Sequence, residues 1–287
     1  MSTKHHALMI FTKAPIPGRT KTRLTTARGG IFTPEEASAF YLASLLDVVE
    51  IAFAALEELN RAAVAKGNGE PQETYDLVLS CSPASEQAIL KEFLREVDPE
   101  LLRMSFISDF GTNFDEHFDD AFEQLFGLGY HSVVAVGGDL PNLPPSHIVQ
   151  AFCWLERLEA GSASGAFVQA PCQECGVSLV GYTASTPIDS QGVYYNLDGV
   201  PALDAYIMRA ARLGIPLATL PPVADVDDVV DLAHAASLIR SADYSKQFQP
   251  DLFVPRHTLA WLNQNSIVVA TPPNQEHDPR EAIDVAN

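Results

Sequence analysis

The sequence predicts an open α/β fold, a three-layer arrangement in which a mostly parallel β-sheet carries helices on both faces. Strand-length apolar segments alternate with helix-length amphipathic segments along residues 7–240. The segment 131–137 is almost continuously apolar, which is typical of a parallel strand buried on both faces. The 287 residues, 47% of them hydrophobic, show no break in composition, so we expect one domain at 7–240 and a C-terminal extension at 241–287.

The first strand and the first helix are the elements that the sequence marks most clearly. Residues 7–11 form an apolar run of strand length, and a loop rich in proline and cations follows at 13–23. Thr33 is a candidate N-cap, Pro34 takes the first helical position and Glu36 completes a capping box. The apolar periodicity after these residues predicts a helix that reaches about residue 59.

The remaining elements follow from the same two periodicities. Further strands are expected at 75–80, 105–108, 131–137, 166–169, 177–181 and 215–220. Further helices are expected at 85–96, 114–126, 145–158, 200–213, 229–239 and, within the C-terminal extension, 253–262. Residues 271–287 are polar and contain proline, so we expect the extension to be partly mobile.

The charge balance excludes several classes of function. The 37 acidic residues outnumber the 18 basic ones and give a net charge of −19, so the average surface repels nucleic acid and anionic membranes. No apolar run approaches the roughly 20 residues that a membrane helix needs, and the polar start lacks the apolar region of a signal peptide. Four scattered cysteines do not form a disulfide framework, so we expect a cytoplasmic protein with no membrane span.

A basic loop follows the first strand. Lys13, Arg19, Lys21 and Arg23 lie within it, and Gly18 allows the backbone to approach a ligand closely. Ammonium and guanidinium groups together can bind a diphosphate or triphosphate, and this cluster stands out in so acidic a chain. The alternative is a solvated loop that balances nearby acidic residues, and composition alone does not decide between the two.

Two acidic segments complete the candidate site. Asp139 follows the buried strand 131–137 in the segment Gly-Gly-Asp-Leu-Pro, at the sheet edge where open α/β proteins bind ligands. A carboxylate there suits Mg²⁺ or Mn²⁺, although it also suits a capped turn. Asp225, Asp227 and Asp228 form a second acidic segment, part of which must cap the helix at 229–239. Since three carboxylates exceed what a cap requires, we expect one to share a metal ion with Asp139.

Three motifs in a fixed order resemble a bacterial family of nucleotide-diphospho-sugar-transferase-like proteins. They are the basic loop that ends in Lys-Thr-Arg-Leu, the strand end Gly-Gly-Asp-Leu-Pro-Asn-Leu and the helix start Asp-Val-Asp. That family is similar to the GT-A glycosyltransferases and, more distantly, to the 2-phospho-lactate and molybdenum-cofactor guanylyltransferases. The resemblance covers about residues 7–239 and implies a metal bound by Asp139 and Asp227. It also implies nucleotide phosphates bound by the basic loop, through Lys13, Gly18, Arg19, Lys21 and Arg23.

The chain departs from that family at residues 171–177. Members carry an acidic residue followed by Gly-Gly-Tyr, where this chain has Pro-Cys-Gln-Glu-Cys-Gly-Val. Glu174 is the only carboxylate in the segment, so we expect it to act in catalysis or in binding of the second substrate. Cys172 and Cys175 lack the further ligands of a closed zinc site and are interpreted as ordinary thiols.

The resemblance implies a transferase that uses a nucleotide-activated donor, a small-molecule acceptor and Mg²⁺ or Mn²⁺ as cofactor. Transfer of a sugar from a nucleotide sugar is the favoured reaction, and transfer of a nucleotide, as in the guanylyltransferases, is the alternative because both use the same metal and phosphate chemistry. A third possibility is a nucleotide-binding protein without catalytic activity, as the departure at residues 171–177 would allow.

Overall fold

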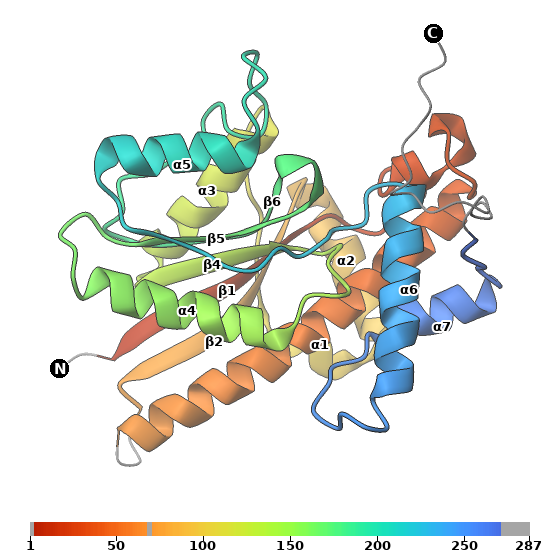
Figure 1. Ribbon diagram of the computed structural model, residues 1–287, viewed down its shortest axis with the longest axis horizontal. Helices are drawn as coiled ribbons and strands as arrows, with labels where there is room; N and C mark the ends of the chain where they lie inside the picture. The colour runs from red at the N-terminus through yellow and green to blue at the C-terminus, as the bar shows by residue number, and fades with distance from the viewer. Residues whose placement is uncertain (1–2, 68–70, 271–287) are drawn as a thin grey trace, which may run out of the picture.

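A computed structural model describes residues 3–67 and 71–270 and contains a seven-stranded sheet in the order β3-β2-β1-β4-β6-β5-β7 (Figure 1). The strands are β1 Lys4–Thr12, β2 Glu73–Cys81, β3 Ser105–Ile107, β4 Ser132–Gly137, β5 Phe167–Pro171, β6 Val177–Thr183 and β7 Leu217–Thr219. Only β6 runs against its neighbours, β4 and β5, while the other pairings are parallel. The expected open, mostly parallel sheet is therefore confirmed.

Helices cover both faces of the sheet. Their bounds are α1 Pro34–Lys66, α2 Gln87–Val97, α3 Phe114–Gly127, α4 Pro145–Glu159, α5 Ala202–Leu213, α6 Val229–Ser245 and α7 Arg256–Gln264. Figure 1 shows α3 and α5 on one face and α1 and α4 on the other. The capping box predicted at Thr33 and Glu36 is present at the start of α1.

Alternate residues of the strands build two separate cores. In β1, Leu8 and Ile10 face α1, α2 and α4, whereas Ala7 and Met9 face α3 and α5. All four side chains are fully buried, as expected for a central strand with helices on both sides. The aromatic stripe at 114–126 belongs to the second core, which agrees with its interpretation as packing rather than function.

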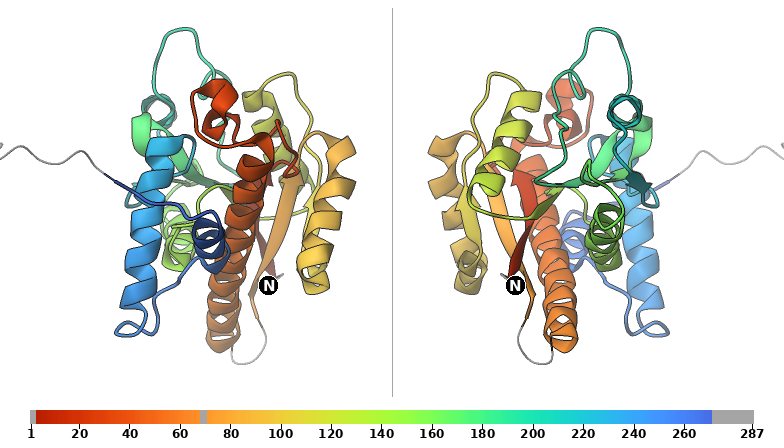
Figure 2. Two further views of the ribbon diagram at one scale, coloured as in Figure 1. Left: turned by 90° about the vertical axis from the view of Figure 1, so that its right-hand side faces the viewer. Right: turned by 90° about the vertical axis from the view of Figure 1, so that its left-hand side faces the viewer.

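A third core joins the N-terminal and C-terminal parts of the chain. It includes Phe40 of α1, Ile239 of α6 and Trp261 of α7, and Figure 2 shows these three helices side by side. Helix α6 runs through residue 240, the expected domain boundary, without a break. The expected mobility of 271–287 concerns residues outside the described part of the chain.

Helix α1 is long and apolar enough to cross a membrane by length and composition, which corrects the expectation that no segment approaches that limit. In its most apolar 18-residue window, 72% of the residues are buried within the protein. Small residues and charged groups interrupt the apolar run in the sequence, but the helix brings the apolar side chains into the first core.

The predicted elements are all present, with shifted ends. Helix α1 continues to Lys66 rather than to about residue 59, and α6 continues to Ser245 rather than to 239. Gly67 is the C-cap of α1 and marks its end in the sequence, whereas no glycine or proline directly follows Ser245 to mark the end of α6. The short 3₁₀ helix Ala84–Glu86 forms the start of the helix predicted at 85–96, whereas the 3₁₀ helix Pro99–Arg103 was not predicted.

Candidate functional site: an acidic and basic cleft at the sheet edge

A cleft of about 1040 Å³ opens at the carboxyl ends of β1, β2 and β4. Strand β1 lies between β2 and β4, so the chain winds in opposite directions on its two sides, and open α/β sheets bind ligands at this switch point. Lys13, Lys21, Asp139, Asp225 and Asp227 all line the cleft. The three segments singled out in the sequence therefore meet in one place.

Two glycines place Asp139 at the end of β4. A Cβ atom on Gly137 would lie 2.4 Å from Oδ1 of Asp139, and one on Gly138 would lie 3.0 Å from the Tyr41 hydroxyl and from Leu45. A side chain at Gly137 would displace the carboxylate, and one at Gly138 would require the side chains of Tyr41 and Leu45 to shift. The Gly-Gly-Asp sequence is thus a steric requirement of the site.

The segment 225–231 divides its carboxylates between a cap and the cleft. Asp228 and Asp231 form a capping box at the start of α6. The backbone N–H of Val226 donates to the carbonyl of Asp139 at 3.2 Å, which holds the segment against the end of β4. Asp225 and Asp227 consequently line the cleft beside Asp139, and Asp228 has the expected capping role.

Lys21 lies between two of these carboxylates. Its Nζ is 2.5 Å from Oδ2 of Asp139 and 2.8 Å from Oδ1 of Asp227, and its side chain is only 7% exposed. The residue has a left-handed backbone with φ of 47°, which is uncommon for a non-glycine residue and occurs often at functional sites. Burial opposes the charge, but Asp139 and Asp227 outweigh it and raise the pKa of Lys21.

The carboxylates of the cleft differ in their affinity for protons. Burial and the neighbouring charges of Asp139 and Asp227 raise the pKa of Asp225 to about 7. Asp227 is also partly buried, yet the ammonium group of Lys21 and the guanidinium of Arg23 lower its pKa. Asp225 is thus close to half-protonated near neutral pH, because burial and the two nearby carboxylates all disfavour its charged form.

The other residues of the basic loop have different surroundings. Lys13 is exposed at the cleft, and no hydrogen bond or ion pair of its side chain occurs among the described residues. Arg19 also lines the cleft, but it forms an ion pair with buried Glu86. Arg23 pairs with Asp227 at 3.2 Å and lines a smaller neighbouring pocket. Gly18 has a left-handed backbone and does not line the cleft.

Glu174 lies outside the main cleft. It is exposed on the short 3₁₀ helix Gln173–Cys175 and lines the smaller pocket, of about 290 Å³, together with Arg23 and Asp227. Its proposed catalytic role remains a prediction. Cys172 lines both pockets, and burial raises the pKa of its thiol, with Asp225 adding to the effect.

Several cleft residues had no predicted role. Asp109 is buried and accepts hydrogen bonds from Ser80 and from His117, whose imidazole lines the cleft. Tyr41 donates to or accepts from Thr12 at 2.7 Å, and burial together with Asp139 raises its pKa to about 12. Neither pair shows in the sequence as a motif, because its members lie 8 and 29 residues apart.

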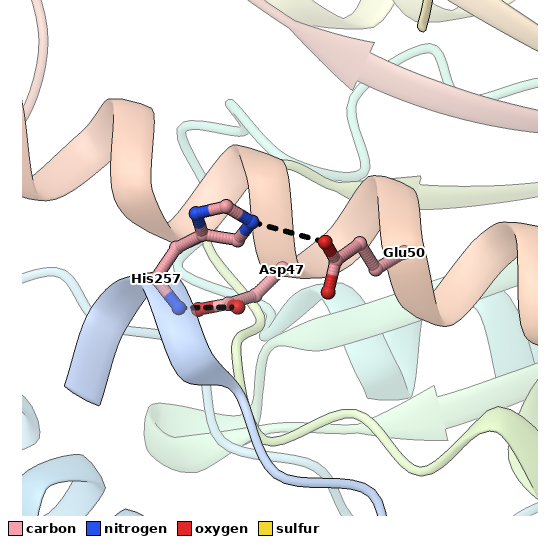
Figure 3. Close-up of side chains that lie close together, drawn as sticks. All are labelled: Asp47, Glu50 and His257. Carbon is pink, nitrogen blue, oxygen red and sulfur yellow. Dashed lines mark hydrogen bonds and ion pairs between the residues drawn. The ribbon is translucent and has the colours of Figure 1, made fainter. Parts of the chain in front are cut away.

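A second group with metal-ligating side chains lies on α1 and α7, where Asp47, Glu50 and His257 place their ligand atoms within 4.8 Å of one another (Figure 3). Asp47 accepts hydrogen bonds from the backbone N–H groups of His257 and Thr258 at 2.9 and 2.7 Å, so it caps the start of α7. Glu50 pairs with His257 and with Arg256. These contacts join α7 to α1, so a structural role between the two helices accounts for the three side chains.

Comparison with solved structures defines the class of fold. A protein from Desulfovibrio desulfuricans G20, described provisionally as a nucleotide-diphospho-sugar transferase, superposes with a TM-score of 0.68 at 20% identity, covering 93% of this chain and 96% of that one. The chain therefore has a nucleotide-diphospho-sugar-transferase-like fold. A cytidylyltransferase from Leptospira borgpetersenii is more distant, with a TM-score of 0.47, 12% identity, and coverage of 95% and 100%.

A family model described as "Uncharacterized protein conserved in bacteria (DUF2064)" matches residues 70–196. This segment includes Asp139 and Glu174 but neither the basic loop nor Asp227. No curated protein matches the sequence.

Proposed function

We propose that this protein is a metal-dependent transferase that uses a nucleotide-activated donor, with sugar transfer from a nucleotide sugar as its reaction. The observation that carries the proposal is the convergence of Asp139, Asp225 and Asp227 with Lys21 in one cleft at the switch point of the sheet. The likeness of the fold to a protein described as a nucleotide-diphospho-sugar transferase supports it.

The residues present fit a divalent cation. Carboxylate oxygens are the ligands that Mg²⁺ and Mn²⁺ prefer, and Asp139 and Asp227 are 24% and 46% exposed, so their side chains are accessible from the cleft. Burial and the neighbouring carboxylates both raise the pKa of Asp225, and a cation bound there would offset the charge of those carboxylates. Bound there, the metal would neutralise charge on the leaving phosphate groups.

The cations of the cleft suit the phosphate groups of the donor. Lys13 is free to bind an anion, and Lys21 holds Asp139 and Asp227 in place while its positive charge faces the same space. An ammonium group that contacts both carboxylates and phosphate would orient the donor and balance charge as the bond to phosphate breaks. Nucleotidyl transfer would use the same groups and differs in the atom that is attacked.

A thermal-shift screen tests this proposal. Nucleoside diphosphates, nucleoside triphosphates and nucleotide sugars are added with Mn²⁺, with Mg²⁺ or with a chelator. A ligand present at 100 times its dissociation constant stabilises the folded state by about 2.7 kcal/mol, which is readily measured. We expect stabilisation by at least one nucleotide only when the metal is present. Stabilisation by no nucleotide would contradict the proposal, and product analysis with each stabilising ligand separates sugar transfer from nucleotide transfer and from binding alone.

A further inference from the structure

We propose that His117 is a general base that accepts a proton from a hydroxyl group of the acceptor, with Asp109 as its positioning residue. This inference rests on the proposed transferase function and names the class of acceptor, a molecule that is attacked through an oxygen carrying hydrogen. The observation behind it is an aspartate–histidine pair in the wall of the cleft.

Asp109 holds the imidazole in one orientation and one tautomer. Its Oδ1 lies 2.7 Å from Nδ1 of His117, and its Oδ2 accepts a hydrogen bond from the Ser80 hydroxyl at 2.6 Å. The Asp109 side chain is fully buried, so water does not compete for the carboxylate. The neutral ring therefore carries its hydrogen on Nδ1, which leaves a lone pair on Nε2.

The His117 side chain, which carries the lone pair on Nε2, lines the cleft. His117 is 27% exposed and lines the cleft, and in the described part of the chain the hydrogen bonds of its ring are all made through Nδ1. Ser82 lies 3.3 Å from that same Nδ1. A serine nucleophile would have to face Nε2, so the arrangement differs from a hydrolase triad and serves an external hydroxyl group.

The proposed step transfers the sugar to the acceptor and a proton to His117. The O–H bond of the acceptor breaks as its oxygen forms a bond to the anomeric carbon of the sugar, and the proton passes to Nε2 of His117. The bond between the anomeric carbon and the phosphate oxygen breaks, and its electron pair leaves with the nucleoside diphosphate. Attack by a phosphate group, as in nucleotidyl transfer to a sugar phosphate, needs no base, so this pair favours sugar transfer to a hydroxyl group.

His117→Gln is the decisive variant, and His131→Gln is its matched control. His131 is 31% exposed and lies 2.7 Å from Glu159, so it resembles His117 in exposure and pairing, but it precedes β4 and lies at the opposite end of that strand from Asp139. Calorimetry measures binding of UDP and GDP with Mn²⁺. Release of nucleoside diphosphate from UDP- and GDP-sugars, with water and sugar alcohols as acceptors, measures turnover.

In His117→Gln we expect turnover to fall at least 100-fold, the low end of the range for a general base, while nucleotide affinity changes less than about twofold. His131→Gln should leave both unchanged. Nucleotide affinity that falls tenfold with turnover would overturn the assignment, because His117 would then contact the donor. Wild-type protein that binds nucleotide but releases none from any donor would also overturn it. Absence of nucleotide binding in the wild type would instead contradict the proposed transferase function.

Asp109→Asn tests the positioning role by a spectroscopic signature. Nitrogen-15 spectra of labelled histidine should show the His117 ring of the wild type with its hydrogen on Nδ1, and the variant should lose this preference. A His117 ring that carries its hydrogen on Nε2 in the wild type would contradict the proposal. The nitrogen-15 measurement does not require a known acceptor. The His117→Gln experiment remains decisive even if Asp109→Asn reduces the stability of the protein.

Discussion

The chemistry of the cleft depends on one lysine among three carboxylates. Lys21 reaches Asp139 and Asp227, whereas no ion pair of Asp225 occurs in the described part of the chain, and burial together with the charges of Asp139 and Asp227 raises the pKa of Asp225 to about 7. Charges this close in a partly buried site interact strongly, so each residue sets the protonation of the others. A cation that enters the cleft should therefore displace a proton as well as bind oxygen.

The first prediction concerns Asp225 in buffer that contains a chelator. Its pKa is 3.8 for an ordinary carboxyl group and about 7 in the folded protein, so between these values the folded state binds more protons than the unfolded state. Stability therefore falls as pH rises from about 4 to about 7 and is constant above that window. Asp225→Asn should remove this fall, which amounts to at most about 1.4 kcal/mol per pH unit. The melting temperatures of the wild type and of Asp225→Asn, measured across this window, should diverge as pH rises. A difference between the two proteins that is the same at every pH would contradict the assignment.

The second prediction separates phosphate binding from nucleoside binding. Lys13→Ala should weaken binding of a nucleoside diphosphate roughly 10- to 100-fold, because a hydrogen bond to a charged group contributes about 1.5–3 kcal/mol. Affinity for the nucleoside should not change. Arg28→Ala removes an exposed cation of the same N-terminal segment that does not line the cleft, and it serves as the control. If calorimetry shows that Lys13→Ala loses equal affinity for the nucleoside diphosphate and for the nucleoside, Lys13 is a structural residue.

Sequence patterns predicted the cleft residues that lie within motifs and missed those that do not. Asp139 and Lys21 follow strands in segments rich in glycine or proline, so their position at the sheet edge could be deduced from topology. The contact between Lys21 and Asp139 joins residues 118 positions apart, and no periodicity encodes it. His117 is part of an amphipathic helix, where a histidine carries no signal until the fold brings Asp109 beside it.

At the scale of the elements, the strands and helices were predictable because each has its own apolar period, and α1, α3 and α6 also begin at recognisable side-chain caps. The order of the strands could not be predicted, since it depends on pairings between distant segments such as β1 with β4. The docking of α7 onto α1 is a similar case. It depends on buried Asp47, which a sequence shows only as one charge in an apolar helix.

The third prediction tests this docking. Asp47→Ala leaves two N–H groups at the start of α7 without their acceptor and should lower the free energy of unfolding by about 1–3 kcal/mol. Glu57→Ala, which removes an exposed carboxylate of the same helix, should change it by less than about 0.5 kcal/mol. Urea denaturation measures both. A chelator should affect the wild type and Asp47→Ala equally, because any metal bound in the cleft is common to both, and a loss of stability confined to the wild type would show that Asp47, Glu50 and His257 bind a metal.

The molecule as a whole is strongly acidic, and Lys13 and Lys21 are basic residues that line its cleft. A net charge of −19 repels anions at long range, so a nucleotide must be held by contacts inside the cleft rather than attracted from a distance. A divalent cation is attracted by the same field. Metal binding is therefore expected to be a condition for nucleotide binding.

Calorimetric titration of a nucleoside diphosphate into the wild type and Asp139→Asn, each with Mn²⁺, tests this claim most directly. The substitution keeps the size of the side chain and removes its charge, and Asp139 is partly exposed, so the fold should remain intact by circular dichroism. We predict metal-dependent binding in the wild type and a loss of at least 100-fold in the variant. Equal affinity in the two proteins would contradict the account, and so would wild-type binding that is unchanged by a chelator.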